Sequence, residues 1–370
     1  ASGGNIIISG SPNLTVGNGG LIKLFTGGIS QSTGLVGYIG NSSGNFRYNS
    51  DEQTTNYTLN LTPNVVSAIY REEVNLSVSL DDKTILYGDS APTFTATVNG
   101  LVNGDKLSYV IADDTINISN YNVGSRPINT AGTTDRLGYS LNYQPGVFTV
   151  NPKTVSLAVA PKVYDASTDM TGYVSITTGV GGETLTYNGA TSNDAHVATA
   201  DKYLNAITLG NASDGSGGLA SNYQLPTLNA ANALVTINPK TLTLTLTNSG
   251  YSQVYDGAAA ADITPAWSFN GFISGDTSAT IAYTGRNYNT ANVTSANLIT
   301  VSGLSITSVA GSNSSAPEDY VLDSTTKTAN ATITPKTVSL AVAPKVYDAS
   351  TDMTGYVSIT TGVGSETLTY

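Results

Sequence analysis

The sequence has 370 residues, a formal net charge of −11 and no cysteine. This charge argues against nucleic acids and anionic membranes as partners, because binding to either depends on clustered Lys and Arg. The absence of cysteine excludes disulfides and thiolate chemistry. No apolar run reaches the roughly 18 residues that span a bilayer, so we expect no membrane insertion of this segment.

Short strands and many turns are the structure that the composition favours. The chain has 22 Tyr and 38 Gly, and only 11% of its residues are charged. Disordered tracts lack so many aromatic residues. Tyr and β-branched residues are typical of strands, and Gly and Asn of the turns between them. We therefore predict an all-β protein.

Residues 1–72 form a region with its own pattern, in which short apolar runs such as Ile6–Ile8 and Leu35–Val36 alternate with Gly, Asn and Ser. Brief strands with tight corners predict the last coils of a right-handed parallel β-helix. Larger residues follow at Phe46–Ser50 and Ile69–Arg71. They predict a cap, because an open coil edge invites pairing with other chains.

Residues 73–151 predict a first β module. Leu76, Val78 and Leu80 alternate with serines, which indicates a strand with one buried face. Turn signals and a closing strand follow: Tyr87-Gly88-Asp89, Asn99-Gly100, Asn103-Gly104, Asn142-Tyr143 and Val147–Val150. Because Asn-Gly pairs admit the primed turns that match strand twist, they predict hairpins.

A motif that runs from Pro-Lys-Thr to Val-Tyr-Asp begins at Pro152, Pro239 and Pro335. Residues 335–370 match residues 152–187 at every position except Ser365, which stands where the first copy has Gly182. Such repetition predicts tandem modules. We place them at 152–238, 239–334 and 335–370. The last copy lacks the later strands of the others, so we expect it to be poorly packed or to borrow a partner strand.

The modules share one order of elements. Their opening strands carry Val155, Leu157 and Val159 in one case and Leu242, Leu244 and Leu246 in the other. A Tyr-Asp turn follows, and then an Asn or Asp before a tyrosine (Asn222-Tyr223 and Asp319-Tyr320, which correspond to Asn142-Tyr143 in the first module). A closing strand ends each module. We predict that the modules are homologous.

The junction at Asn238–Thr241 is too short for a flexible tether. Pro239 fixes φ and removes a hydrogen-bond donor, so it interrupts a strand while the chain stays extended. Short linkers of this kind limit bending. The sequence therefore predicts a semi-rigid, monomeric rod of β-sandwich-like modules.

These motifs resemble those of known domain families. Tyr87-Gly88-Asp89 is similar to the MBG domain, and Val163–Ala166 and Val254–Gly257 resemble the YDG domain, both of which occur in tandem in large bacterial surface adhesins. The end of residues 1–72 resembles the close of the β-helical shaft in filamentous-haemagglutinin-type adhesins exported by two-partner secretion. The resemblance implies a stalk at the outer membrane or in the biofilm matrix, without catalysis. Ala166 and Ala349 replace the Gly of the YDG motif, so the turn there need not be one that requires positive φ.

Two patterns could indicate catalysis. Gly40–Gly44 matches a nucleophile elbow around Ser42, yet the single histidine, His196, lies in another module, and we favour a plain β-helix corner as the explanation of the glycines. The acids of the Tyr-Asp turns (Asp165, Asp256, Asp348) could transfer protons. Because these acids recur in each module, we expect them to accept the N–H groups of their own turns, with the tyrosine packed into the end of the sandwich.

A polysaccharide-degrading enzyme built on the β-helix is a further hypothesis. Its candidate acids are Asp51, Glu52, Glu72 and Glu73, all near the end of the region. We expect no catalytic residue in the chain.

Calcium is the one cofactor that the sequence brings into question. Asn211–Gly217 offers several oxygen ligands, and the pairs Asp81-Asp82 and Asp113-Asp114 offer fewer. None has the alternating spacing of a calcium loop, and solvated turns explain all three. We expect no metal site and no cofactor.

Trp267 is the candidate contact for a ligand. With Phe269 and Phe272 nearby it could stack on sugar rings, but residues at i and i+2 of a strand also face a core. The hypotheses are therefore a stalk, which we favour, and a carbohydrate-binding region that grips extracellular polysaccharide or another cell-surface ligand. Both imply a secreted protein at the bacterial cell surface. The sequence begins without a signal peptide, so we expect any export signal to lie outside it.

Overall fold

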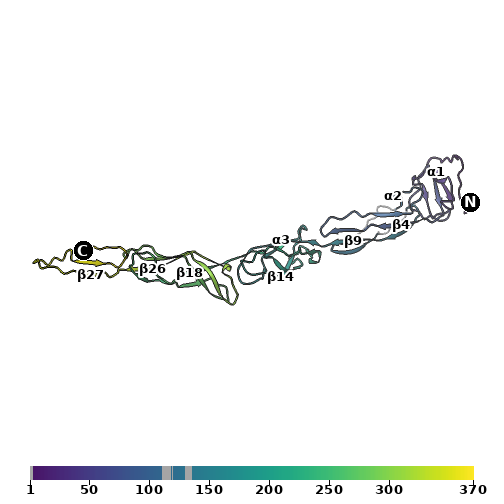
Figure 1. The fold of residues 1–370 in the computed structure, drawn as a ribbon. Helices are drawn as coiled ribbons and strands as arrows, with labels where there is room; N and C mark the ends of the chain where they lie inside the picture. The colour runs from purple at the N-terminus through teal and green to yellow at the C-terminus, as the bar shows by residue number, and fades with distance from the viewer. Residues whose placement is uncertain (1–2, 111–117, 119, 130–135) are drawn as a thin grey trace. The chain divides into compact units, whose positions relative to one another are not determined.

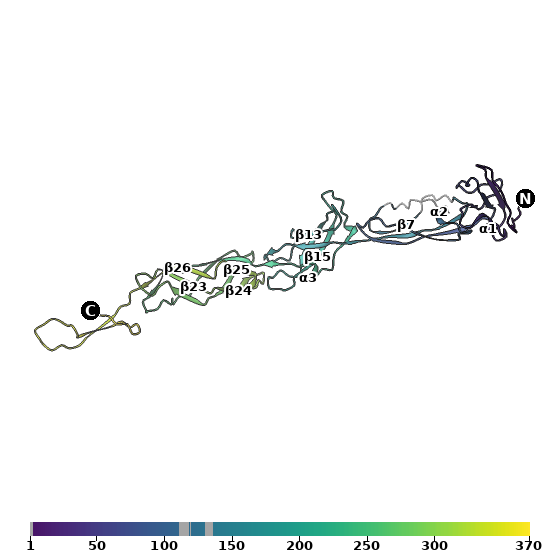
Figure 2. The ribbon, with the colours of Figure 1, turned by 90° about the horizontal axis from the view of Figure 1, so that it is seen from above.

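The computed structural model describes residues 3–110, 118, 120–129 and 136–370. Its contacts divide the chain into two compact units. Unit 1 consists of Ala1–Val155, Thr178–Leu185 and Asn211–Gln224, and unit 2 of Ser156–Thr177, Thr186–Gly210 and Leu225–Tyr370. Strands predominate in both, as predicted, and the helices are single turns (Figures 1 and 2). The boundaries between the units fall inside the predicted module 152–238.

The elements of unit 1 are as follows: β1 (Ile22–Thr26), α1 (Leu35–Ile39), β2 (Phe46–Arg47), β3 (Val66–Tyr70), β4 (Asn75–Leu80), β5 (Lys83–Leu86), β6 (Ala96–Asn99), α2 (Leu107–Val110), β7 (Gly124–Ile128), β8 (Ser140–Gln144), β9 (Gly146–Asn151), β10 (Lys153–Thr154), η1 (Ala220–Asn222) and β16 (Tyr223–Gln224). No helix in the described ranges is long and apolar enough to cross a membrane.

The first region contains one parallel sheet in the order β1-β3-β2. Successive β-helix coils would stack in chain order, whereas here the third strand lies between the first two. Two apolar runs are not the strands that the pattern predicts: Ile6–Ile8 is irregular, and Leu35–Val36 begins α1. Gly34 and Gly40 bound α1 with φ of 78° and 98°, and such left-handed corners confine the chain to a single helical turn.

Two three-stranded sheets follow, in the orders β6-β4-β8 and β5-β9-β7. The predicted alternation along β4 is confirmed, because Leu76, Val78 and Leu80 are buried. The Asn103-Gly104 pair has φ of 53° and 70°, as a primed turn requires. It does not join two paired strands, however, because α2 follows it in the described chain.

The elements of unit 2 are as follows: β11 (Ser156–Val159), β12 (Lys162–Val163), β13 (Val174–Thr177), β14 (Thr186–Ser192), β15 (Leu204–Gly210), α3 (Ala230–Ala233), β17 (Ile237–Asn238), β18 (Lys240–Leu246), β19 (Tyr251–Val254), β20 (Trp267–Asn270), β21 (Asp276–Ala282), β22 (Gly285–Tyr288), β23 (Leu298–Ser302), β24 (Ser305–Gly311), η2 (Pro317–Asp319), β25 (Tyr320–Leu322), β26 (Thr326–Thr334), β27 (Ser339–Val342) and β28 (Val357–Thr360). Figures 1 and 2 show β26 beside other strands in the C-terminal half of unit 2.

The modules repeat one pairing scheme, which confirms their common plan. Each opening segment pairs in parallel with a later strand (β4 with β8, β10 with β16, β18 with β25). The strand before each tyrosine turn also pairs in parallel with the closing strand (β5 with β9, β12 with β17, β19 with β26). β11–β13, β18–β20 and β27–β28 are antiparallel, as β4–β6 is.

The register corrects one predicted correspondence. Tyr223 and Tyr320 pair with the lysines that begin β10 and β18. In the first module the equivalent residue is Tyr139, directly before β8, and not Tyr143, which pairs with Val78. The two tyrosines are four residues apart and so lie on the same face of a strand, which is why the alternation pattern could not distinguish them.

The hydrophobic cores continue across the predicted module boundaries. Within unit 1, Phe46, Tyr48 and Tyr70 of the first region belong to one cluster with Leu76 and Tyr139 of the next. Within unit 2, one cluster joins two predicted modules through the following members: Tyr164, Met170, Leu242 and Tyr320. A continuous apolar core resists bending far more than a solvated linker does.

The YDG-like copies show one unusual turn and one loosely packed end. Ala166 and Ala349 have φ of 60° and 63°, so these turns have a positive φ although they lack the glycine. The turn keeps its left-handed residue although a Cβ makes that conformation unfavourable. In the last copy Leu340 and Val342 are 65% and 62% exposed, which confirms the poor packing expected there.

Candidate functional site

The two residues of the nucleophile-elbow hypothesis, Ser42 and His196, have structural partners. Ser42 belongs to unit 1, has φ of 63°, and donates its backbone N–H to Asn103 (3.0 Å). His196 belongs to unit 2, where its Nδ1 lies 2.7 Å from Oδ2 of Asp319. The enzymatic hypothesis remains untested by these contacts.

The acids at the end of the first region also take part in local contacts. Asp51 accepts the N–H of Gln53 (2.8 Å), and Glu72 accepts that of Ile29 (2.6 Å). Glu52 pairs with Arg71. These contacts shape loops around the parallel sheet.

The acids of the Tyr-Asp turns accept N–H groups of their own turns, as predicted. The acceptor is Oδ1 in each case: Asp165 from Ser167 (2.9 Å), Asp256 from Ala258 (2.9 Å) and Asp348 from Ser350 (3.0 Å). Tyr164 is 1% exposed, which confirms the predicted packing of the tyrosine in that copy, but Tyr347 of the last copy is 92% exposed, so the prediction is wrong there.

A lysine also binds the oxygens of this turn, and the sequence pattern did not lead us to expect its role. Lys162 Nζ donates to the carbonyls of Ser167 (2.9 Å) and Asp169 (2.7 Å), and it lies 2.8 Å from Oδ1 of Asp165. Lys345 makes the same three contacts in the last copy. The ammonium group thus occupies the centre of a ring of oxygens. The recurring spacing Lys-Val-Tyr was the available signal.

The acidic residues that could have been calcium ligands accept hydrogen bonds from other protein groups. Asp214 accepts from Thr184 Oγ1 (2.7 Å) and from the N–H of Ser216 (3.0 Å), and these bonds lower its pKa to about 2. Asp82 accepts the N–H of Val147 (2.7 Å), and Asp81 accepts from Thr95. The pair Asp113-Asp114 lies outside the described residues. Within the described ranges, no group of three or more His, Cys, Asp or Glu could hold a metal ion.

Trp267 is half-buried on β20 opposite Leu246 and packs against the hydrophobic core of the module. Phe269, on the same face, packs there too. The predicted role of Trp267 in ligand contact remains a prediction.

The feature that recurs is a carboxylate bound by tyrosines from two predicted regions, which we call a tyrosine–carboxylate cluster. In the first cluster, Tyr48 donates to Oδ2 of Asp105 (2.6 Å), and Tyr139 donates to the same oxygen (2.8 Å). The two rings lie 4.5 Å apart. Asp105 is 5% exposed, and the two hydroxyls replace water at Oδ2, whereas Oδ1 is buried without a hydrogen-bond partner among the described residues.

The second cluster also lies in unit 1. Tyr87 donates to Oε1 of Glu183 (2.7 Å) and Tyr223 to Oε2 (2.6 Å). The rings meet edge to face at 5.3 Å, an arrangement that adds attraction to the burial of both. Here one carboxylate divides its two oxygens between the regions that it joins.

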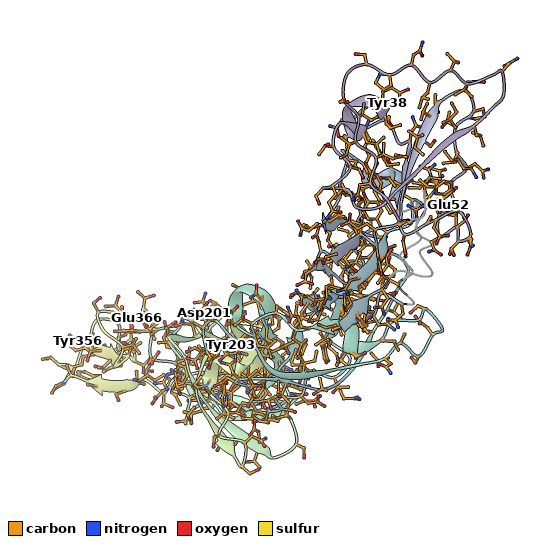
Figure 3. The ribbon with its side chains drawn as sticks, turned by 90° about the vertical axis from the view of Figure 1, so that its right-hand side faces the viewer. Tyr38, Glu52, Asp201, Tyr203, Tyr356 and Glu366 are labelled. Carbon is orange, nitrogen blue, oxygen red and sulfur yellow. The ribbon has the colours of Figure 1, made fainter. Side chains whose placement is uncertain are left out.

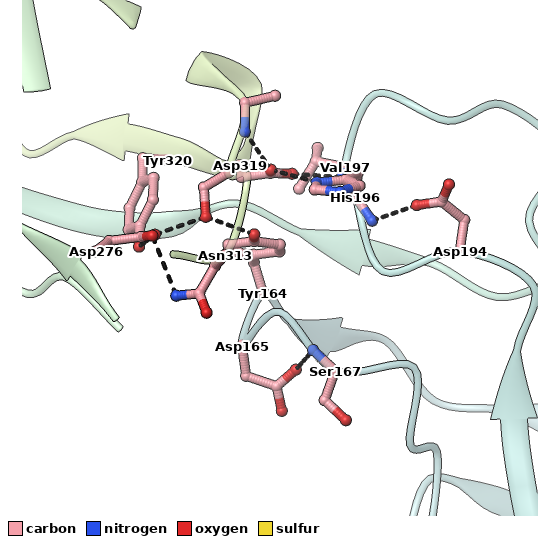
Figure 4. Close-up of polar contacts among 12 residues, drawn as sticks. Tyr164, Asp165, Ser167, Asp194, His196, Val197, Asp276, Asn313, Asp319 and Tyr320 are labelled. Carbon is pink, nitrogen blue, oxygen red and sulfur yellow. Dashed lines mark hydrogen bonds and ion pairs between the residues drawn. The ribbon is translucent and has the colours of Figure 1, made fainter. Parts of the chain in front are cut away.

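The third cluster lies in unit 2 and is shown in Figure 4. Tyr320 donates to Oδ2 of Asp276 (2.6 Å), and Ser315 donates to the same oxygen (2.6 Å). Tyr164 reaches the carboxylate through this serine, since its hydroxyl lies 2.7 Å from Ser315 Oγ. A serine therefore relays the contact that Tyr48 and Tyr87 make directly.

The fourth contact, also in unit 2, is simpler. Tyr255 donates to Oε1 of Glu366 (2.6 Å), whose place near the C-terminal end is labelled in Figure 3. Val363, at the start of the same turn, is buried, and a Cβ added to Gly257 would lie 2.7 Å from its Cγ1. The tyrosine turn and the acidic turn therefore fit closely.

All four carboxylates come from one kind of turn, in which the backbone N–H of the acid donates to the carbonyl three residues earlier. The pairs are Asp105 with Val102, Glu183 with Val180, Asp276 with Ile273 and Glu366 with Val363. The turn reads Val or Ile, any residue, Gly or Ser, and then Asp or Glu. This pattern was visible in the sequence, but its link to tyrosines far along the chain was not.

Burial shifts the titration of these groups. It raises the pKa of Asp105, although the Tyr48 and Tyr139 hydroxyls act in the opposite direction. Burial also raises the pKa of Tyr48, Tyr139, Tyr223 and Tyr320. For Tyr255 the largest cause of the raised pKa is the bond to Glu366. The tyrosine hydroxyls therefore keep their protons and act as hydrogen-bond donors over the whole physiological pH range, which suits contacts that hold regions together.

Two family models match the chain. Residues 76–149 match the MBG domain (YGX type), and residues 238–329 match the YDG domain. The comparison with curated proteins gives no match.

Proposed function

Because the chain carries an MBG domain and a YDG domain, we propose that it is a stalk segment of a large secreted bacterial adhesin. Both kinds of domain occur in surface-associated repeat proteins. In this proposal the modules hold a distal adhesive region away from the cell, for adhesion between cells or within a biofilm matrix. The parent protein is exported by two-partner secretion and remains associated with the outer membrane.

The continuity of the core at the module contacts carries the proposal. The first and third contacts combine buried apolar side chains with a tyrosine–carboxylate cluster, as the third does through Tyr164, Asp276 and Tyr320. Hydrogen bonds to a charged acceptor contribute about 1.5–3 kcal/mol each. Contacts of this kind transmit force along a chain and need neither catalysis nor a cofactor.

Residues 1–72 have a place in the same proposal. In this proposal the region is the end of a right-handed parallel β-helix whose last strand, β3, has moved between β1 and β2, and the buried rings of Phe46, Tyr48 and Tyr70 form its cap. The shaft of the adhesin would thereby pass directly into the modules.

Small-angle X-ray scattering of the 370-residue chain tests the stalk. Compact modules of this size have radii of gyration near 12 Å, so a line of them should exceed about 120 Å in maximum dimension. A compact particle would contradict the proposal.

Antibody labelling of intact cells tests the location, with permeabilised cells as the control. Retention on a matrix polysaccharide that Trp267→Ala abolishes would favour the binding role instead.

A further inference from the structure

Two of the contacts between modules share a second feature, in which the residue directly before a clustered tyrosine reaches a preceding loop. Within unit 1, Asn222 Oδ1 accepts the backbone N–H of Val123 (3.0 Å). Within unit 2, Asp319 Oδ1 accepts that of Val197 (2.7 Å). Because Tyr223 and Tyr320 hold the same register, Asn222 and Asp319 are equivalent positions.

The second side-chain atom of each residue meets a different kind of partner. Asn222 Nδ2 donates to Oδ1 of Asn122 (3.0 Å), which is a neutral amide pair. Asp319 Oδ2 instead lies 2.7 Å from Nδ1 of His196. Amides do not titrate, whereas an imidazole gains a proton close to neutral pH. One contact can therefore respond to pH where its counterpart cannot.

Asp319 depends on the donors that surround it. Its side chain is 0% exposed, and its remaining bond comes from the N–H of Ala316 (2.8 Å). A neutral imidazole donates from Nδ1 in only one of its two tautomers, whereas the imidazolium always carries this proton and adds a positive charge. Figure 4 shows the contact between His196 and Asp319. Since the His196 side chain is 35% exposed, solvent can deliver the proton while the contact stays closed.

The other groups around the imidazole include both signs of charge. Asp194, on the same loop, accepts the backbone N–H of His196 (2.6 Å). Lys202 donates to the carbonyl of Val197 (3.0 Å). The ring of Tyr164 stacks on the imidazole at 6.0 Å, and its hydroxyl leads through Ser315 to Asp276. Carboxylates therefore outnumber ammonium groups around the site.

We propose that His196 and Asp319 form a proton-operated latch, which tightens the contact between residues 152–238 and 239–334 as the pH falls from 8 to 5.5. A proton from solvent binds the imidazole, and the hydrogen bond to Asp319 becomes an ion pair. The contact of Asn122 and Asn222 stays unchanged. The latch rests on this geometry alone and does not depend on the stalk function.

Hydrogen exchange of the 370-residue chain, resolved at single amides and corrected for intrinsic rates, tests the latch. Protection of the Val197 N–H should rise about three- to tenfold between pH 8 and pH 5.5. This fold-change corresponds to the difference in strength between weaker and stronger hydrogen bonds to charged groups. Protection of the Val123 N–H, the internal control, should stay constant. Equal behaviour of the two amides would overturn the proposal.

His196→Asn supplies the matched variant, because asparagine is the residue at the equivalent position 122. Its Val197 protection should not change over the same pH range. His196→Gln is a second variant of similar polarity, and protection of the amides of β23, which pairs with β26 in unit 2, reports whether unit 2 of either variant is folded. A pH response of Val197 that persists in both variants would refute the role of His196.

Discussion

The Tyr48–Asp105–Tyr139 cluster and the Tyr255–Glu366 pair place the same chemical groups in opposite surroundings. Asp105 is buried, and Tyr48 has no exposed surface. Glu366 is exposed and Tyr255 half-buried. The donor–acceptor distances are alike, at 2.6 Å for both Tyr48 and Tyr255. Distance alone therefore says little about stability, because water can replace the partner in one place and not in the other.

This difference gives each contact its own role. A buried carboxylate without donors keeps the full penalty of its lost hydration, so the first cluster must stay closed for unit 1 to stay folded. An exposed carboxylate recovers its hydration when the contact opens. The first contact should therefore behave as part of a core, and the fourth as a contact that opens readily.

The largest expected effect comes from removing the buried acceptor. Asp105→Ala leaves the hydroxyls of Tyr48 and Tyr139 without their carboxylate and should lower the free energy of unfolding of unit 1 by about 3 kcal/mol. Urea denaturation followed by near-ultraviolet circular dichroism measures this. Asp105→Asn is the control, because it keeps one acceptor oxygen and removes a buried charge; it should stay within about 1 kcal/mol of the parent. Equal losses in the two variants would contradict the role of the acceptor.

Alkaline pH should produce the next largest effect. Burial raises the pKa of Tyr48 and Tyr139 above the ordinary value of 10.0, so the folded state binds their protons more tightly than the unfolded state does. The stability that they contribute is complete below pH 10 and is lost as the pH rises through their folded pKa. The free energy of unfolding should fall by about 1.4 kcal/mol per pH unit for each such tyrosine.

Phenolate absorbance together with denaturation between pH 9 and 12 checks this window. Tyr48→Phe should reduce the slope of stability against pH, since one linked proton is removed. A slope that is the same with and without Tyr48 would show that other groups control alkaline unfolding.

The smallest effect is expected at the exposed Tyr255–Glu366 pair. Tyr255→Phe removes a hydrogen bond that water can replace, so the thermal midpoint of unit 2 should not change measurably, whereas Tyr48→Phe should cost about 1–3 kcal/mol in unit 1. Differential scanning calorimetry of both variants compares them. If Tyr255→Phe destabilised its unit as strongly as Tyr48→Phe does, exposure would not govern the strength of these contacts.

Local patterns in the sequence were sufficient for several elements. The alternation of Leu242, Leu244 and Leu246 predicted a strand with one buried face, and β18 has that face. The Tyr-Asp turns follow from the habit of Asp to accept nearby N–H groups. Outside such patterns the predictions failed. Leu35–Val36 forms a helical turn between glycines, and Ile6–Ile8 is irregular, although both apolar runs look like strands.

The sequence by itself determined the all-β class, the repetition of modules and the turn that presents each acidic residue, because all of these depend on neighbours within a few positions. Only the tertiary structure decided which tyrosine meets which carboxylate. Tyr87 and Glu183 are far apart in the chain, and Tyr139 and Tyr143 look equivalent until the parallel register is known. Partners of that kind are fixed by the packing of whole strands, which no local pattern encodes.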